Sequence, residues 1–384
     1  MSAAASSQCS RVRSVVSCLL VASALIAGAC SRQETRTEAQ PVADAAADKS
    51  LHVLQRPGYF APETLPDFQS RTGIEVTFQE LGAEDAIEER LLAGKSGFDV
   101  VVVSSYFLAR QVHAGLFTKL DKGWLPNLHY VDPQSLERAQ RHDPGNEQSI
   151  PYLWGTTGIA YDRRRIEAVM GGAPVDSWRL VFDPELAAKF AACGLYLPDA
   201  AEEVVSLALM WLGRDPDDAQ AEDFAAAESV LAAVRPYVRP VSRSRYVAEL
   251  AAGNLCVAVA RSTDLLAGER TGKPGAVTID YSIPKEGTLV WYDVLAIPAD
   301  SRHSRNAHAF VDYLLEPRVA ASNANFGRYA NANSGAAALL DEDLTSNGKI
   351  YPTADQQARL VALPSRSEAF TREAARIWAE LASK

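Results

Sequence analysis

Two strand-like runs of the sequence end in side chains that could hold a small charged molecule. At or just beyond the ends of the runs 257–260 and 288–294 stand the polar and aromatic residues Arg261, Ser262, Asp264, Trp291 and Asp293. In open α/β sheets, ligands bind in the crevice beyond the carboxyl ends of the strands. Either run alone is equally well explained by a strand cap and a surface ion pair, but the two together favour a binding site.

Common enzyme and metal motifs are absent from the sequence. Its 6 histidines are scattered without HExxH spacing, and no Cys-x-x-Cys pair, serine-hydrolase elbow, Gly-rich dinucleotide fingerprint or P-loop occurs. The adjacent acids Glu202 and Glu203 could serve acid–base chemistry. They begin an apparent helix, however, where acids favour the positive end of the helix dipole. We therefore predict a binding protein rather than an enzyme, without a metal or a cofactor.

The length and composition suit two medium-sized α/β lobes. The chain has 384 residues, of which 47% are hydrophobic and 22% are charged, and this is ample apolar material for a core. Its formal net charge is −10. This charge argues against a nucleic-acid partner, because binding phosphate groups requires a basic face.

The N-terminal segment predicts export. Arg11 and Arg13 precede the apolar stretch 15–29, which is too short for a usual membrane-spanning helix and ends in small residues. This order is typical of a signal peptide, which we place at 1–29. The mature protein is therefore expected in the periplasm.

Cys30 follows this segment and is a candidate for lipidation. The residues before it resemble a bacterial lipoprotein box, although Ala27 stands where an aliphatic residue is usual. Residues 30–50 are polar and unpatterned, as in a flexible tether. We expect a lipid-anchored form, with a freely soluble form as the alternative.

The remaining cysteines favour one disulfide. Cys9 and Cys18 leave with the signal peptide, which leaves Cys193 and Cys256 in the folded part of the chain. Two cysteines in an exported domain predict a bridge, which in this long loop would stabilise the fold by around 4 kcal/mol. Two separate buried thiols are the alternative.

Alternating strand and helix patterns predict a parallel α/β unit after the tether. The expected elements are strand 51–54, helix 62–70, strand 73–78, helix 85–93, strand 98–103 and helix 107–114. The glycine-containing run 152–161 suggests a segment that crosses between lobes. Further along, we expect helices at 204–212, 221–234 and 306–315, strand character at 278–291 and a helical tail over 355–384.

Motifs spread over the mature chain resemble those of the periplasmic polyamine-binding proteins of ABC uptake systems. They include TGIEV (72–76), GFDVVV (97–102), HDPGN (142–146), PYLWGTTGIAY (151–161), SIPKEG (282–287) and DVLAIPAD (293–300). The resemblance implies an α/β, two-lobe periplasmic-binding-protein fold (type II), with doubly wound sheets joined by hinge crossings. One lobe would comprise 51–153 plus 276–320, and the other 157–273 plus 324–384.

The resemblance also implies a function and partners. The lobes would close by hinge motion on a putrescine- or spermidine-like ligand, and the protein, a monomer, would deliver it to the membrane subunits of an ABC permease. The family's disulfide falls on Cys193 and Cys256, which agrees with the cysteine count.

Several family ligand contacts are present at matching positions. These residues are Tyr59, Ser104, Glu203, Asp264, Asp293 and Tyr329, with Trp291 at an aromatic position and Tyr106 as in spermidine-preferring members. Carboxylates can hold an ammonium group by charge-assisted hydrogen bonds, and aromatic walls can cover a methylene chain.

Three arginines depart from the family pattern. Arg56-Pro57-Gly58 replaces Trp-Ser-Asp before Tyr59, Arg261 replaces a wall tryptophan, and Arg243 replaces a small polar residue. Three guanidinium groups beside a dicationic ligand are electrostatically unfavourable.

Three interpretations of these arginines remain open. In the first, the ligand is zwitterionic, such as an ω-amino acid or an acylated or glutamylated polyamine; Asp264 and Asp293 hold its amine, and the arginines hold its carboxylate. In the second, the arginines pair internally, for instance Arg261 with Asp264, and a polyamine still binds. In the third, the site has drifted and the protein serves as a sensor or scaffold. An extracytoplasmic enzyme is a more distant alternative, because it would need a nucleophile and base that the sequence does not offer.

Overall fold

The computed structural model describes residues 49–81, 85–270, 279–362 and 367–382. The expected signal peptide, Cys30 and nearly all of the expected tether lie outside these ranges. Among the described helices, none has the length and apolar character needed to cross a bilayer.

The first part of the described chain is the expected parallel α/β unit. It consists of β1 (Ser50–Gln55), α1 (Thr64–Thr72), β2 (Glu75–Glu80), α2 (Asp85–Leu92), β3 (Val100–Ser104) and α3 (Ser105–Val112). β1 pairs in parallel with both β2 and β3. The prediction made from the alternating patterns is therefore confirmed for this unit.

Local sequence signals set the ends of several helices. Gly73 ends α1 in the left-handed conformation at φ 69°, which a glycine adopts without steric cost. α9 (Ala221–Val234) begins with a capping box between Gln220 and Asp223. Its bounds coincide with the predicted helix.

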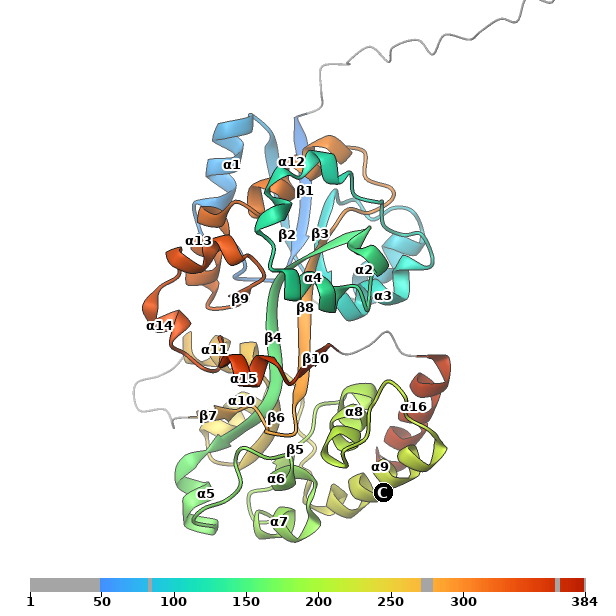
Figure 1. The fold of residues 1–384 in the computed structure, drawn as a ribbon, viewed down its shortest axis with the longest axis vertical. Helices are drawn as coiled ribbons and strands as arrows, with labels where there is room; N and C mark the ends of the chain where they lie inside the picture. The colour runs from blue at the N-terminus through green and yellow to red at the C-terminus, as the bar shows by residue number, and fades with distance from the viewer. Residues whose placement is uncertain (1–48, 82–84, 271–278, 363–366, 383–384) are drawn as a thin grey trace, which may run out of the picture. The chain divides into compact units, whose positions relative to one another are not determined.

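Two long strands run side by side through the structure (Figure 1). β8 (Thr288–Ala296) pairs antiparallel with β3 and with the segment of β4 (Ser149–Asp162) from Ser149 to Thr156. From Thr157 onward, β4 pairs instead with β6 (Val257–Arg261) and β7 (Ile279–Ser282). All residues of β4 are buried. β4 is therefore the crossing segment that the sequence predicts.

Smaller strands and the remaining helices complete the fold. The smaller strands are β5 (Leu195–Tyr196), β9 (Ala330–Asn331) and β10 (Leu360–Ala362). The remaining α-helices are α4 (Pro133–Ala139), α5 (Arg163–Val169), α6 (Arg179–Phe182), α7 (Pro184–Lys189), α8 (Ala201–Trp211), α10 (Tyr246–Ala251), α11 (Ser262–Arg270), α12 (Ser304–Leu314), α13 (Pro317–Gly327), α14 (Glu342–Thr345), α15 (Ala354–Gln357) and α16 (Glu368–Ala382). Short 3-10 helices span Lys122–Trp124, Pro126–Tyr130, Pro144–Asn146, Arg235–Tyr237 and Ser334–Leu339.

Two large hydrophobic clusters pack around these strands. The first surrounds β1, β3 and β8 and includes Phe107 and Phe310. The second lies among α6, α8, α9 and α16 and includes Trp178 and Phe182. Apolar side chains thus gather on both sides of the crossing, as a two-lobe protein requires.

The segment 324–362, which the expected division places in the second lobe, contributes buried residues to the first cluster. Its buried residues Tyr329, Leu344 and Leu360 belong to that cluster. β9 pairs with β4 at Leu153 and Trp154, and this ladder holds the segment on the first side of the crossing. In the described part of the C-terminal region, the buried residues of the second cluster come from α16, and the partly buried Val361 also packs against this cluster.

The prediction of a helical tail over 355–384 is wrong in part. β10 interrupts it and pairs in parallel with β8 at Thr288–Val290. The partner strand is distant in sequence, so the local periodicity of the tail carries no sign of it.

Cys193 and Cys256 form a disulfide, with Cα atoms 5.5 Å apart and a sequence separation of 63. The predicted bridge is confirmed, and the alternative of two free thiols is wrong. Cys256 immediately precedes β6, so the bridge ties the start of this strand to the chain just before β5.

Candidate ligand-binding site

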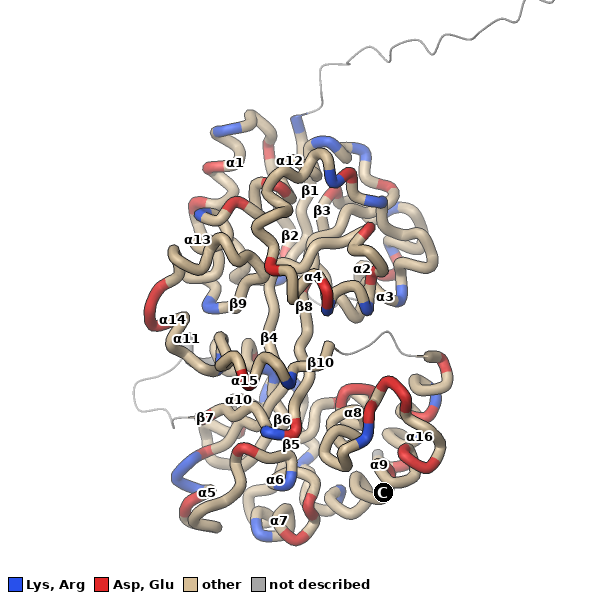
Figure 2. Tube along the Cα trace, in the orientation of Figure 1, with Lys and Arg blue, Asp and Glu red and all other residues tan. Residues whose placement is uncertain are grey.

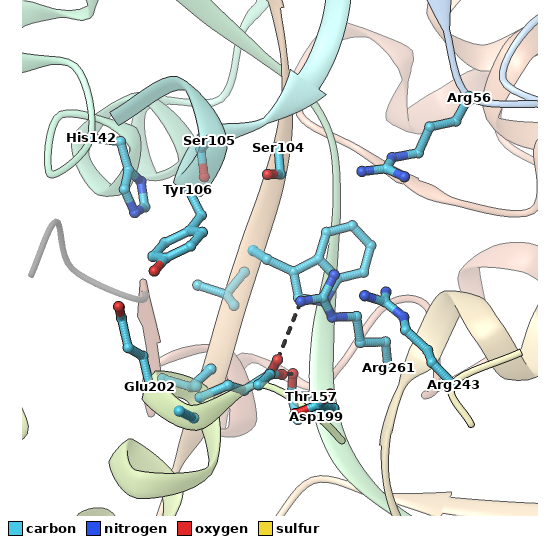
Figure 3. Close-up of a pocket in the computed structure, with 16 residues that line it drawn as sticks. Arg56, Ser104, Ser105, Tyr106, His142, Thr157, Asp199, Glu202, Arg243 and Arg261 are labelled. Carbon is cyan, nitrogen blue, oxygen red and sulfur yellow. Dashed lines mark hydrogen bonds and ion pairs between the residues drawn. The ribbon is translucent and has the colours of Figure 1, made fainter. Parts of the chain in front are cut away.

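A polar pocket of about 460 Å³ lies beside the crossing strands (Figure 3). Its lining combines the end of β3 and start of α3, part of β8, the start of α8 and three arginines. The lining residues are Arg56, Ser104, Ser105, Tyr106, His142, Thr157, Asp199, Ala200, Ala201, Glu202, Glu203, Arg243, Arg261, Leu289, Val290 and Trp291. The volume is that of a small-molecule site.

The pocket side chains sit at junctions between strands and helices. Ser104 ends β3 and caps α3, its hydroxyl oxygen accepting from the Phe107 amide at 3.1 Å. Arg261 ends β6 directly before α11. Glu202 and Glu203 lie in the first turn of α8, where the helix dipole favours negative charge. These are the strand and helix ends at which a ligand is expected.

Arg261 is held between a carboxylate and an aromatic ring. Its Nη2 donates to Glu203 Oε2 at 3.2 Å, and the guanidinium lies 5.7 Å from the centroid of the Trp291 ring. Burial alone lowers the pKa of Arg261, but the charge of Glu203, with smaller help from Asp264, outweighs it and raises that pKa. The internal partner suggested from the sequence, Asp264, is wrong, because Arg261 pairs with Glu203.

The environment of Glu203 is nearly closed. Its side chain is 7% exposed, against 30% for Arg261. The Thr157 hydroxyl donates to its second oxygen. Both carboxylate oxygens are therefore engaged by residues of the protein itself.

Arg56 stands beside the second carboxylate, Asp293. Arg56 Nε lies 3.6 Å from Asp293 Oδ2, and the Tyr59 hydroxyl donates to the same oxygen. Burial, and then the charge of Asp293, raise the pKa of Tyr59 well above its usual value, so the phenol stays a donor. The Tyr59 ring meets the edge of Tyr329 at 4.9 Å between centroids.

Arg243 approaches the third carboxylate, Asp264, less closely. Its Nε lies 4.0 Å from Asp264 Oδ2, which also accepts from the Tyr246 hydroxyl at 2.9 Å. Asp264 borders a separate cavity of about 50 Å³ next to the main pocket. Figure 2 shows both basic and acidic positions along the chain around β5 and β6.

Trp291 lies flat against β4 because position 155 is glycine. A Cβ atom on Gly155 would meet the Trp291 ring at 2.3 Å. Within the described ranges, the indole nitrogen of Trp291 is buried without a hydrogen-bond partner. Trp291 therefore presents a ring to the pocket and a contact to Arg261.

The structure brings together most of the residues predicted to bind ligand, but not all. Those that line the main pocket are Arg56, Ser104, Tyr106, Glu203, Arg243, Arg261 and Trp291. Asp264 borders the smaller cavity, while Tyr59, Asp293 and Tyr329 line neither cavity. Among the residues that the structure describes, no group of three or more His, Cys, Asp or Glu side chains could hold a metal ion.

Glu202 is a pocket residue that sequence reasoning missed. Its Oε2 atom is buried and has no hydrogen-bond partner in the described part of the chain. The signal was present in the sequence, because successive helical residues point about 100° apart. Two adjacent acids at a helix start cannot therefore share one environment, and only one of them could satisfy Arg261.

Crossing strands, apolar packing on both sides of them and a polar pocket beside them define a two-lobe binding protein. The chain belongs to the bacterial extracellular solute-binding protein family, whose model matches residues 63–353. Members of this family are found outside the cytoplasm, in agreement with the predicted location.

Two relatives and one solved structure resemble most of the chain. The putrescine-binding periplasmic protein PotF of Escherichia coli is 39% identical over 343 residues, covering 88% of this chain and 93% of its own. The putrescine-binding periplasmic protein SpuD of Pseudomonas aeruginosa is also 39% identical, over 89% of this chain and 94% of its own. The spermidine/putrescine ABC transporter substrate-binding protein PotD from Streptococcus pneumoniae is 23% identical, with a TM-score of 0.77 over 87% of this chain and 98% of that structure.

These findings confirm the expected fold class and the expected family. The relatives are substrate-binding transport proteins, so the prediction of a binding protein rather than an enzyme is also confirmed.

Proposed function

We propose that this chain is the periplasmic receptor that delivers an amine-bearing solute to an ABC permease, and that this solute also carries a carboxylate. The similarity to putrescine-binding proteins over nearly the whole chain supports the amine and the permease. The pocket charges support the carboxylate.

One observation supports a ligand that differs from the polyamines of the related proteins. Each carboxylate that the family resemblance assigns to a ligand amine has an arginine beside it: Glu203 has Arg261, Asp293 has Arg56 and Asp264 has Arg243. A guanidinium therefore already occupies the place of the ligand's cation. In the case of Arg261, it also occupies the place against the aromatic wall.

Guanidinium groups bring several hydrogen-bond donors to the pocket. A guanidinium has five N–H groups in a fixed fork that matches a carboxylate. The contact with Glu203 uses the Nη2 atom of Arg261. The other donors of the Arg261 guanidinium suit an incoming carboxylate, so the amine roles first considered for Asp264 and Asp293 are no longer the favoured ones.

The lining does not favour a dication. Its arginines Arg56, Arg243 and Arg261 are matched in number by the acids Asp199, Glu202 and Glu203. A polyamine would gain little net Coulomb attraction from such a lining, whereas a zwitterion needs none. The 4-aminobutyrate and 5-aminovalerate molecules are the simplest ligands of this kind.

The remaining parts of the proposal concern how the receptor works. Two lobes, one around each hydrophobic cluster, close on the ligand by rotation about β4 and β8. The mature protein acts as a monomer held at the membrane by a lipid on Cys30. Mass spectrometry of the mature protein tests this last point directly.

Titration calorimetry tests the ligand class. We expect 4-aminobutyrate or 5-aminovalerate to bind the mature chain at least about tenfold more tightly than putrescine or spermidine. The double variant Arg56→Trp with Arg261→Trp is the matched control, because it restores the family's aromatic walls, and it should prefer polyamines. Submicromolar putrescine binding by the unmodified chain, without binding of either amino acid, would contradict the proposal.

A further inference from the structure

Glu202 is distinguished from the other acids around the pocket by its lack of a partner. Glu203, Asp264 and Asp293 each have an arginine within 4.0 Å. Asp199 accepts from the Trp378 indole at 2.7 Å. In the described part of the chain, Glu202 has a buried carboxylate oxygen that accepts no hydrogen bond. Among these acids, Glu202 is therefore the one whose charge a ligand would have to satisfy.

The position of Glu202 gives the pocket two unlike sides. In Figure 3, the Glu202 side chain points toward Tyr106 and His142, while Arg56, Arg243 and Arg261 stand on the opposite side. The Glu202 carboxylate thus stands on one side of the pocket, and the guanidinium groups stand on the other.

The chemistry between the two sides suits a short aliphatic chain. Leu289, Val290 and Trp291 of β8 contribute apolar surface to the same pocket. Methylene groups gain from contact with such surface, whereas a polar ligand backbone would lose hydrogen bonds to water there.

We propose that Glu202 binds the ammonium group of the ligand while the arginines bind its carboxylate. The inference rests on the proposed function and narrows it to one substrate class, the ω-amino carboxylic acids. An ammonium group has three donors and forms its stronger hydrogen bonds with an ionised carboxylate. α-Amino acids are disfavoured, because their two charged groups sit too close together to reach both sides.

Two pairs of ligands test this arrangement in the mature chain. 5-Aminopentanoate, which is the 5-aminovalerate named above, and 2-aminopentanoate are isomers that differ in the separation of their charges. Pentanoate has the same chain and carboxylate but no amine. We expect calorimetry to show that 5-aminopentanoate binds about tenfold or more tightly than either of the others.

The variant Glu202→Gln separates the role of Glu202 from that of the pocket. It should weaken 5-aminopentanoate binding about tenfold or more and leave pentanoate binding unchanged. Glu222→Gln is the matched control, because Glu222 is an exposed acid in the first turn of α9. It should leave both affinities unchanged.

Each contrary outcome points to a different error. Unchanged affinity of Glu202→Gln for 5-aminopentanoate would overturn the role of Glu202 and leave the proposed function standing. Failure of the unmodified chain to bind any ω-amino acid would overturn both.

Discussion

The carboxylates on the two sides of the pocket differ in whether the protein itself supplies their hydrogen-bond partners. On the arginine side, Glu203 is bound by Arg261 and by Thr157, so its charge is matched inside the protein. On the other side, Glu202 keeps a buried oxygen without a partner in the described chain. These two acids are adjacent in sequence. This difference is the basis of the proposal that Glu202, rather than Glu203, binds the ligand's cation.

On the arginine side, Arg261 ends β6, and the disulfide at Cys256 ties down the start of this strand. Removing the disulfide should have the largest effect on stability. The double variant Cys193→Ser with Cys256→Ser should lower the free energy of unfolding by about 4 kcal/mol, because the bridge closes a long loop. Urea unfolding of the variant and of the oxidised protein gives the difference.

A reduced sample of the unmodified protein is the control for this variant, and it should unfold at the same urea concentration as the double variant. A loss below about 1 kcal/mol would mean that β6 and Arg261 are held in place by packing alone.

Replacing each adjacent glutamate in turn tests the contrast directly. Glu203→Gln should lower the free energy of unfolding by about 2 kcal/mol, because it leaves the Arg261 guanidinium partly buried without its anion. Glu202→Gln should change it by less than about 0.5 kcal/mol or raise it, because it replaces a half-buried carboxylate whose Oε2 atom has no hydrogen-bond partner in the described chain. Thermal unfolding of both variants in the absence of ligand provides the comparison. Equal losses for the two variants would show that the two sides do not differ.

The smallest effect is expected at the outer edge of the arginine side. Arg243 is 59% exposed and lies 4.0 Å from Asp264, so its ion pair is well solvated. Arg243→Ala should change the free energy of unfolding by less than about 0.5 kcal/mol, as is usual for surface pairs. A loss comparable with that of Glu203→Gln in the same thermal unfolding experiment would place Arg243 among the buried pairs.

The parts of the fold that depend on local patterns could be predicted from the sequence. The alternation of strands and helices from β1 to α3 is visible because each element carries its own periodicity. β10 was missed because its three residues are fixed by pairing with β8, and no local pattern records that contact. The same reason explains why local patterns do not predict the packing of Tyr329, Leu344 and Leu360 with the first cluster.

The residues of the site could be predicted from the sequence, but the residues with which they pair could not. The strand ends indicated Arg261, and the resemblance indicated Glu203, yet sequence proximity suggested Asp264 as the partner of Arg261. The partner is Glu203 on α8, 58 positions away in sequence. Glu202 was assigned to the helix dipole, which accounts for an acid at that position without saying what it faces. Pairings across the fold depend on tertiary geometry, and a single sequence does not contain them.

The paired strands β4 and β8 connect the two sides of the crossing and also border the pocket. These strands are paired to each other from Ser149 to Thr156 on β4, so they cannot slide as separate connectors and can only twist together. Thr157 follows that ladder directly, and Trp291 lies within it. A ligand that touches these residues therefore resists the torsion of the strands. We therefore expect that a ligand with higher affinity restricts the twisting of these two strands more strongly.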